Sequence, residues 1–147
     1  MTLRFSPAQP EDLEGLYQLN RDLITEYEDL DSIDFPLVLQ WVRRNLEKNL
    51  PFFTRVLWNE QIVGYYCLTP SDGKAELDSL FVLPPFQNQG IGTQILRKCQ
   101  EEVTTPLFLY VFRKNTRAVS LYQKMGFQIV QEVGISRHIM EYQKQGC

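Results

Sequence analysis

The sequence contains few cysteines, one histidine and no long apolar run. The three cysteines, Cys67, Cys99 and Cys147, are odd in number and widely spaced, which argues against a disulfide framework. His138 is the only histidine, so no pair of ligands stands at metal-binding spacing and we expect no metal site. No apolar stretch approaches the ~20 residues of a membrane helix, and residues 1–14 lack the apolar centre of a signal peptide. We therefore expect a cytoplasmic protein that does not act at a membrane.

The sequence also lacks an excess of basic residues. It has 15 Lys and Arg against 18 Asp and Glu, a formal net charge of -3, so nucleic acid is not an expected partner. Of its 147 residues, 44% are hydrophobic and 22% are charged, as in ordinary globular proteins. Because no Gly/Ser-rich or Pro-rich linker interrupts the chain, we expect residues 1–147 to form a single domain with one core.

The spacing of apolar residues predicts an α+β fold around a central mixed sheet. A first helix is expected to begin at Pro10, and a second after Asp34, with Pro36 in its first turn. Further helices are predicted for residues 93–103 and 116–125. Strands are predicted for residues 3–5, 52–58, 62–69, 75–83, 107–111, 127–133 and 137–142. The expected order is strand, two helices, three strands, helix, strand, helix and two strands.

A glycine-rich turn joins the strand at 75–83 to the following helix. In this turn, Gln87 to Thr93, the two glycines Gly90 and Gly92 allow a close approach of the backbone, and the helix start offers unpaired N–H groups. Such a turn can bind a pyrophosphate, although an ordinary tight turn has the same composition. The turn is neither a Walker loop nor the dinucleotide-binding fingerprint, which disfavours ATP and NAD.

Two motifs resemble those of the GNAT superfamily of acyl-CoA-dependent N-acyltransferases. The segment ELDSLFVLPPFQNQGIGTQIL is similar to the family's cofactor motif, Q/R-x-x-G-x-G/A after the fourth strand. The motif N-x-x-A-x-x-x-Y-x-x-x-G-F follows as Asn115, Ala118, Tyr122, Gly126 and Phe127. The resemblance covers nearly the whole chain. It implies a mostly antiparallel seven-stranded sheet flanked by about four helices, with acetyl-CoA as the co-substrate.

The resemblance also implies where acetyl-CoA binds. The fourth and fifth strands would splay apart to admit the pantetheine arm, which would pair with backbone groups of Val82 and Leu83 before Pro84 ends the strand. The N–H of Leu83 or of its neighbour would stabilise the oxyanion. The residues expected at the pyrophosphate are Gln87, Asn88, Gln89, Gly90, Ile91, Gly92 and Thr93.

Several residues after the fifth strand have two interpretations each. Asn115 resembles a family residue that binds the cofactor arm, and an Asn before a helix is also a common N-cap. Arg113, Lys114 and Arg117 are candidates for the 3'-phosphate, although charged loop residues are often only solvated.

The resemblance supplies two catalytic candidates. Tyr122 matches the family's general acid, which protonates the coenzyme A thiolate; its alternative role is core packing. Glu76 matches the general base of some members, while Asp78, on the same side of the strand, and a water chain remain open as bases. Both carboxylates could instead be solvated residues on the polar side of the sheet. We expect Cys99 in the core and no catalytic role for His138, which has no visible carboxylate partner.

The acceptor is expected to be an amine that takes the acetyl group directly, in a ternary complex. Glu26, Glu28, Asp29, Asp31 and Asp34 lie within nine residues and would attract an acceptor with a second positive charge, unless they are merely a solvated loop. Protein or peptide acetylation, at an N-terminus or a lysine, and a non-catalytic acyl-CoA-binding domain are the alternatives. The bulky Phe81, Phe86 and Phe108 favour a short acetyl group. A free sheet edge leaves a homodimer open.

Overall fold

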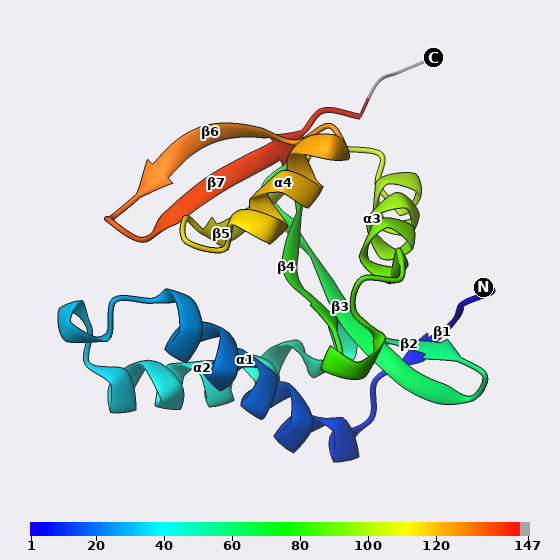
Figure 1. The fold of residues 1–147 in the computed structure, drawn as a ribbon, viewed down its shortest axis with the longest axis horizontal. Helices are drawn as coiled ribbons and strands as arrows, with labels where there is room; N and C mark the ends of the chain where they lie inside the picture. The colour runs from blue at the N-terminus through cyan, green and yellow to red at the C-terminus, as the bar shows by residue number, and fades with distance from the viewer. Residues whose placement is uncertain (145–147) are drawn as a thin grey trace.

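The computed structural model describes residues 1–144 and contains one seven-stranded sheet (Figure 1). The strands are β1 (Arg4–Pro7), β2 (Phe53–Trp58), β3 (Gln61–Ser71), β4 (Lys74–Val82), β5 (Leu107–Phe112), β6 (Gln128–Val133) and β7 (Arg137–Tyr142). The α-helices are α1 (Leu13–Tyr27), α2 (Phe35–Asn49), α3 (Ile91–Glu102) and α4 (Thr116–Lys124). The spatial order of the strands is β1-β2-β3-β4-β5-β7-β6.

The predicted fold class is confirmed. The elements follow one another along the chain in the expected order, and every neighbouring pair of strands is antiparallel except β4 and β5, which are parallel. The second helix begins as predicted, because the Asp34 carboxylate accepts a hydrogen bond from the Leu37 N–H at 3.2 Å. Among residues 1–144, no helix is long and apolar enough to cross a membrane.

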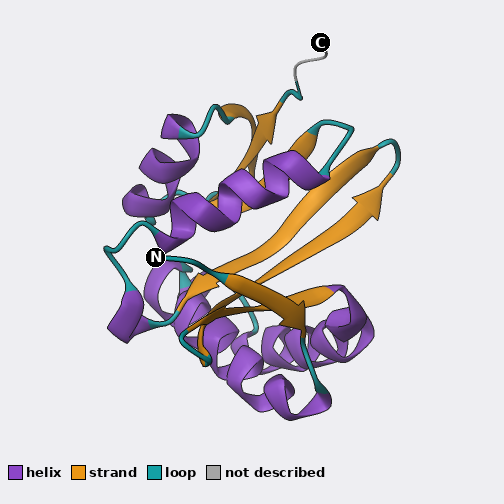
Figure 2. Ribbon diagram, turned by 90° about the vertical axis from the view of Figure 1, so that its right-hand side faces the viewer, coloured by secondary structure: helices purple, strands orange, loops and turns teal. Residues whose placement is uncertain are grey.

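Helices cover both faces of the sheet, but not equally (Figure 2). Helices α3 and α4 pack on one face around a cluster that includes Ile95, Leu96 and Cys99, all with fully buried side chains. The predicted core position of Cys99 is thus confirmed. Helices α1 and α2 pack on the other face, where Leu16 and Leu46 contribute to a second cluster together with residues of β2, β3 and β4. From β5 this second cluster includes only Phe112.

A β-bulge in β4 sets the geometry of the sheet centre. Cys67 of β3 is opposite Ser79 and the next residue, Leu68, is opposite Leu77, so Asp78 is an extra residue without a partner. The bulge places Glu76 and Ser79 on the same face, whereas strict alternation over three positions would place them on opposite faces. Strict alternation failed there because it takes no account of a bulge.

Strands β4 and β5 pair over only two register positions. Ala75 is opposite Leu107 and Glu76 is opposite Phe108; beyond this point the ladder ends, although β4 continues to Val82. The predicted divergence of these two strands is confirmed. Backbone groups on this side of β4, from Leu77 to Val82, therefore have no partner strand.

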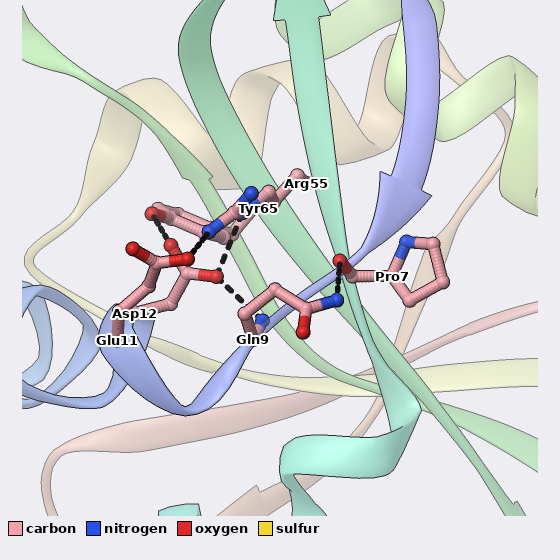
Figure 3. Close-up of polar contacts among 6 residues, drawn as sticks. All are labelled: Pro7, Gln9, Glu11, Asp12, Arg55 and Tyr65. Carbon is pink, nitrogen blue, oxygen red and sulfur yellow. Dashed lines mark hydrogen bonds and ion pairs between the residues drawn. The ribbon is translucent and has the colours of Figure 1, made fainter.

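A buried carboxylate fixes the corner between β1 and α1 (Figure 3). The side chain of Asp12 accepts hydrogen bonds from Arg55 Nε at 2.7 Å, from the Tyr65 hydroxyl at 2.8 Å and from the Gln9 N–H at 2.7 Å. Burial opposes ionisation, but these hydrogen bonds outweigh it and hold the pKa of Asp12 below its usual range. Asp12 thereby links the start of α1 to β2 and β3.

Replacing Asp12 should destabilise the fold. Asp12→Ala leaves the guanidinium of Arg55 and the hydroxyl of Tyr65 without their partner, so we expect the free energy of unfolding to fall by about 3 kcal/mol in urea titrations. Glu11→Ala is the matched control, since Glu11 is an exposed partner of Arg55 at 3.2 Å. Its replacement should lower the free energy of unfolding by less than about 1 kcal/mol. Because the folded-state pKa of Asp12 is lowered, its contribution is present at neutral pH and is lost as the pH falls below about 4. Equal losses for both variants at neutral pH would contradict this assignment.

Candidate active site

The main cavity has a volume of about 450 Å³ and lies where β4 diverges from β5. It is bordered by β4, the β4–α3 loop, the first turns of α3 and α4, and the last turns of α1. Its lining residues are Leu23, Glu26, Tyr27, Leu80, Phe81, Val82, Phe86, Gln87, Asn88, Gly90, Ile91, Gly92, Thr93, Asn115, Arg117, Ala118, Leu121 and Tyr122.

The start of α3 opens into this cavity without a side-chain cap. Gly90 is the N-cap of α3 and has no side chain to accept a hydrogen bond from the first turn, whereas the side chains of Asp34 and Asn115 cap α2 and α4. The first N–H groups of α3 are therefore available to an anion, and the helix dipole adds a partial positive charge. The position fits a pyrophosphate, as predicted for the glycine-rich turn.

The two glycines of this turn meet different structural requirements. Gly90 has φ +80°, a left-handed conformation that L side chains rarely adopt, and a Cβ there would meet no atom within 4 Å. A Cβ on Gly92 would lie 3.2 Å from Leu121 Cδ2, so Gly92 allows α3 to approach α4 closely. Only Gly90 therefore offers open space beside the helix start.

Two side-chain hydrogen bonds hold the β4–α3 loop in place. Gln87 Nε2 donates to the carbonyl oxygen of Val82 at 3.0 Å, and the guanidinium of Arg117 on α4 donates to Asn88 Oδ1. Asn88 has φ +65°, an uncommon value for a residue other than glycine, and the bond to Arg117 stabilises that conformation. The loop is thus shaped before any ligand binds.

The backbone of Leu83 differs from the expectation. Its N–H donates to the Val63 carbonyl at 2.8 Å and so extends the β3–β4 ladder. That N–H is not free for a pantetheine arm or an oxyanion, which corrects the role predicted from the sequence. In an antiparallel ladder the backbone groups alternate in direction, so the N–H of Val82 points away from β3 towards the opening. Val82 therefore offers the free N–H that Leu83 lacks.

Most of the predicted cofactor residues meet in one place. Eight of them line the main cavity, namely Val82, Gln87, Asn88, Gly90, Ile91, Gly92, Thr93 and Asn115. Leu83 and Gln89 are not among the lining residues. Asn115 also accepts a hydrogen bond from the Ala118 N–H at 3.3 Å, so it caps α4 beside the cavity. Arg117 lines the cavity, while Arg113 and Lys114 lie at a separate pocket of about 110 Å³.

Tyr122 lies on α4 with only 9% of its surface exposed, and it lines the cavity. Its ring packs against Phe127 with 5.7 Å between the ring centroids. Burial raises the pKa of Tyr122, which keeps the phenol protonated at neutral pH. No residue among 1–144 makes a hydrogen bond with its hydroxyl group, so the proton is free to be donated to a ligand. The side chain thus combines core packing with an accessible acid.

Glu76 and Asp78 form a half-buried carboxylate pair on β4. Burial, followed by the negative charge of Asp78, raises the pKa of Glu76 above its usual range. Burial also raises the pKa of Asp78, and a hydrogen bond from Ser79 Oγ at 3.3 Å partly opposes this effect. A carboxylate with a raised pKa is a stronger base, which suits proton removal from an amine. The pKa of the neighbouring Cys67 thiol is also raised, mainly by burial, so this cysteine is unreactive.

The acid and the base candidates lie on opposite faces of the sheet. Tyr122 belongs to the cluster under α3 and α4, and Glu76 points to the other side, because its neighbour Leu77 is part of that same cluster. Glu76 does not line the main cavity. The two side chains can act on one molecule only through the opening between β4 and β5.

Much of the acidic loop before α2 has structural contacts of its own. Glu28 accepts the Asp29 N–H at 3.1 Å, Asp29 accepts the Ser32 hydroxyl at 2.7 Å, and Asp34 caps α2. Of the five acidic residues, only Glu26 lines the main cavity. These donors are neutral and leave the carboxylates charged, but they fix three of them within the structure of the loop itself.

The structure also gives His138 a carboxylate neighbour that the sequence did not reveal. Its Nδ1 lies 2.9 Å from Glu132 Oε1 on the adjacent strand β6, without the geometry of a hydrogen bond. His138 is not part of the main cavity. Among residues 1–144, no group of three His, Cys, Asp or Glu side chains could hold a metal ion.

Comparison with known proteins agrees with the family resemblance of the two sequence motifs. The family model described as Acetyltransferase (GNAT) family matches residues 13–127. The peptidyl-lysine N-acetyltransferase YjaB of Salmonella typhimurium is 26% identical over 129 residues, which cover 88% of this chain and 86% of that protein. The spore coat polysaccharide biosynthesis protein SpsD of Bacillus subtilis is 27% identical over 132 residues, 82% of this chain. This match covers 45% of SpsD, so the chain spans about half the length of that relative.

Solved structures share the fold. The PaiA N-acetyltransferase from Thermoplasma acidophilum, in complex with coenzyme A, has a TM-score of 0.75 at 22% identity, covering 97% of this chain and 99% of that one. YncA from Salmonella typhimurium, with acetyl-CoA, has a TM-score of 0.66 at 16% identity, covering 100% and 96%.

The space beside Gly90 can be tested with acetyl-CoA. Gly90→Glu places a side chain and a negative charge at the uncapped helix start, so the rise in melting temperature that acetyl-CoA causes in the wild type should disappear. Gly73→Glu is the matched control, because Gly73 has φ +77° and equally open surroundings in the β3–β4 turn. Both variants should lose about 1 kcal/mol of stability from backbone strain. If acetyl-CoA still raises the melting temperature of Gly90→Glu, the pyrophosphate does not bind at this loop.

Proposed function

Because the chain belongs to the acetyltransferase (GNAT) family, we propose that it transfers the acetyl group of acetyl-CoA directly to an amine in a ternary complex. Family membership makes residues 13–127 an acetyl-CoA-dependent acetyltransferase domain, as the two sequence motifs predicted. The observation that carries the proposed reaction is the uncapped start of α3, which opens into the cavity that leads to Tyr122.

The donor would lie along that cavity. Its pyrophosphate would accept hydrogen bonds from the N–H groups of Gly90, Ile91 and Gly92, and Arg117 would supply a positive charge nearby. The amide-bearing pantetheine arm would continue β4 in place of the missing partner strand, bonded to the backbone of Val82. The thioester would then reach the point where β4 and β5 begin to diverge, close to Glu76 and Phe108.

The chemistry requires two protons to leave the nitrogen and one to be supplied to the sulfur. Glu76, directly or through a water molecule, would remove a proton from the ammonium group, and the free amine would attack the thioester carbon. An N–H of β4 without a partner strand, between Leu77 and Val82, would stabilise the resulting oxyanion. The nitrogen of the intermediate loses its second proton to water. Collapse of the intermediate then breaks the carbon–sulfur bond, and the Tyr122 phenol gives its proton to the departing thiolate. Solvent returns a proton to Tyr122 and takes one from Glu76, so the enzyme is regenerated.

The acceptor is proposed to be a primary amine in which the reacting ammonium group carries the one positive charge. Because Glu26 alone of the five acidic residues lines the main cavity, the acidic loop gives little support to an acceptor with a second charge. A lysine side chain is a second candidate, since the relative YjaB is named a peptidyl-lysine N-acetyltransferase and aligns with most of this chain.

Release of coenzyme A, followed with a thiol reagent, tests this proposal. We expect release from acetyl-CoA that depends on an added amine. Lysine-containing peptides acetylated in preference to free amines would favour the second candidate. Acetyl-CoA binding without release in the presence of any amine would identify a non-catalytic binding domain instead.

Removing the Tyr122 hydroxyl should slow the chemical step. We expect Tyr122→Phe to lower kcat by about 10²-fold or more, because the thiolate then departs without a proton. The ring still packs against Phe127, so the melting temperature and the affinity for acetyl-CoA should stay near those of the wild type. Tyr142→Phe is a suitable control, since Tyr142 also contacts Phe127 but does not line the cavity. A Tyr122→Phe variant with wild-type kcat would exclude Tyr122 as the acid.

The pH profile should identify the base. A general base acts in its deprotonated form, so kcat/KM should rise as the pH increases through the pKa of Glu76, with a midpoint above the usual range of a glutamate. Glu76→Gln should abolish this rising limb of the pH profile and lower kcat/KM by about 10²-fold. Asp78→Asn removes a neighbouring negative charge and should move the midpoint to lower pH, because that charge raises the pKa of Glu76. If Asp78→Asn abolishes the limb and Glu76→Gln does not, Asp78 is the base.

A further inference from the structure

Within residues 1–144, the second half of the sheet has one face that no helix covers. Helices α1 and α2 pack against β2, β3 and β4. In Figure 1 the β6–β7 hairpin lies above them, and its turn, with Ile135 and Ser136, lines a small pocket together with Tyr27 and Asp29. On this face Phe108 of β5 stands opposite Glu141 of β7, and Tyr110 stands opposite Ile139. Their neighbours Leu107 and Leu109 point to the other face and belong to the core under α3 and α4.

Three large apolar side chains lie on this uncovered face. Phe108, Tyr110 and Ile139, which we call the open platform, belong to neither of the two core clusters. Tyr110 is 43% exposed, its ring stands edge-on to that of Phe108 with 6.3 Å between centroids, and the Arg137 guanidinium lies 5.2 Å from its centre. An antiparallel sheet can leave one face to water, but that face then carries mainly polar residues, so large apolar side chains on it indicate a binding surface.

The open platform begins at the point where the reaction is proposed to occur. Phe108 is opposite Glu76 in the last register pair before β4 and β5 diverge. A group resting on Phe108 is therefore next to the proposed base and next to the end of the pantetheine arm. Glu141, on the far side of Phe108, is paired with Lys74 at 3.1 Å, which leaves Glu76 and Asp78 as the carboxylates available to an incoming ammonium group.

We propose that the open platform binds the carbon body of the acceptor, which is a primary amine carried on an apolar or aromatic group. This inference rests on the proposed acetyltransferase function. The ammonium group is held by the carboxylates of Glu76 and Asp78, and the apolar body covers the rings of Phe108 and Tyr110. A second charge at the far end of the acceptor would lie over the apolar side chain of Ile139, where no described carboxylate is free to pair with it.

A matched pair of acceptors tests this specificity. Hexylamine and 1,6-diaminohexane have the same carbon chain and differ in the charge at the far end. With acetyl-CoA at saturation, we expect the KM of hexylamine to be lower by about tenfold or more. A KM for 1,6-diaminohexane that is equal or lower would overturn the proposal.

Substitutions at Tyr110 test the surface itself. Tyr110→Ala should raise the KM of hexylamine by about tenfold, with little change in kcat or in the affinity for acetyl-CoA, and Tyr110→Phe should restore it. Val130→Ala is the matched control, since Val130 is a 54% exposed apolar residue on β6 outside the open platform, and its KM should equal that of the wild type. A Tyr110→Ala variant with unchanged KM would place the acceptor elsewhere.

A binding measurement separates failure of this inference from failure of the proposed function. Hexylamine titrated into the protein with coenzyme A should shift the backbone amide NMR signals of Phe108, Tyr110 and Ile139 in the wild type, and not in Tyr110→Ala. Such shifts without any acetylation would support the open platform and refute the proposed reaction. Acetylation of hexylamine without these shifts would support the reaction and overturn the open platform.

Discussion

The site depends on how early the parallel ladder between β4 and β5 ends. Two register pairs hold these strands together, and the bulge at Asp78 comes directly after the second of them. A bulge increases the local twist and bend of its strand, so β4 turns away from β5 where the bulge begins. The backbone that loses its partner strand there is the same backbone that a ligand with amide groups can bind. Cavity, base candidate and open platform all adjoin this point.

The bulge also determines which side chains reach which face. Because Asp78 is an extra residue, Leu77 and Leu80 both belong to the core under α3 and α4, although they are an odd number of positions apart. Glu76 and Asp78 are thereby kept on the half-buried opposite side, where burial and mutual repulsion raise the pKa of Glu76. One irregular position thus supplies both the opening for the donor and a carboxylate suited to act as a base.

The sequence predicted the elements, their order and much of the site, because these follow from local patterns. The glycine-rich turn before a helix and the Asn115 and Tyr122 motif each lie within one short segment, and their residues line one cavity. The bulge at Asp78 was not predictable, since a register shift depends on the partner strand. For the same reason, the sequence did not show that Val63 engages the N–H of Leu83, or that Asp12 meets Arg55 and Tyr65, more than forty residues away.

The position of Tyr122 and Glu76 on opposite faces of the sheet has a kinetic consequence. A donor that enters beside α3 and α4 and an acceptor that lies over the uncovered face of β5 and β7 approach the opening from opposite sides. Neither molecule has to pass the other, so either can bind first and either product can leave first. We therefore expect the two substrates to add in random order, because each reaches the reaction centre from its own face of the sheet.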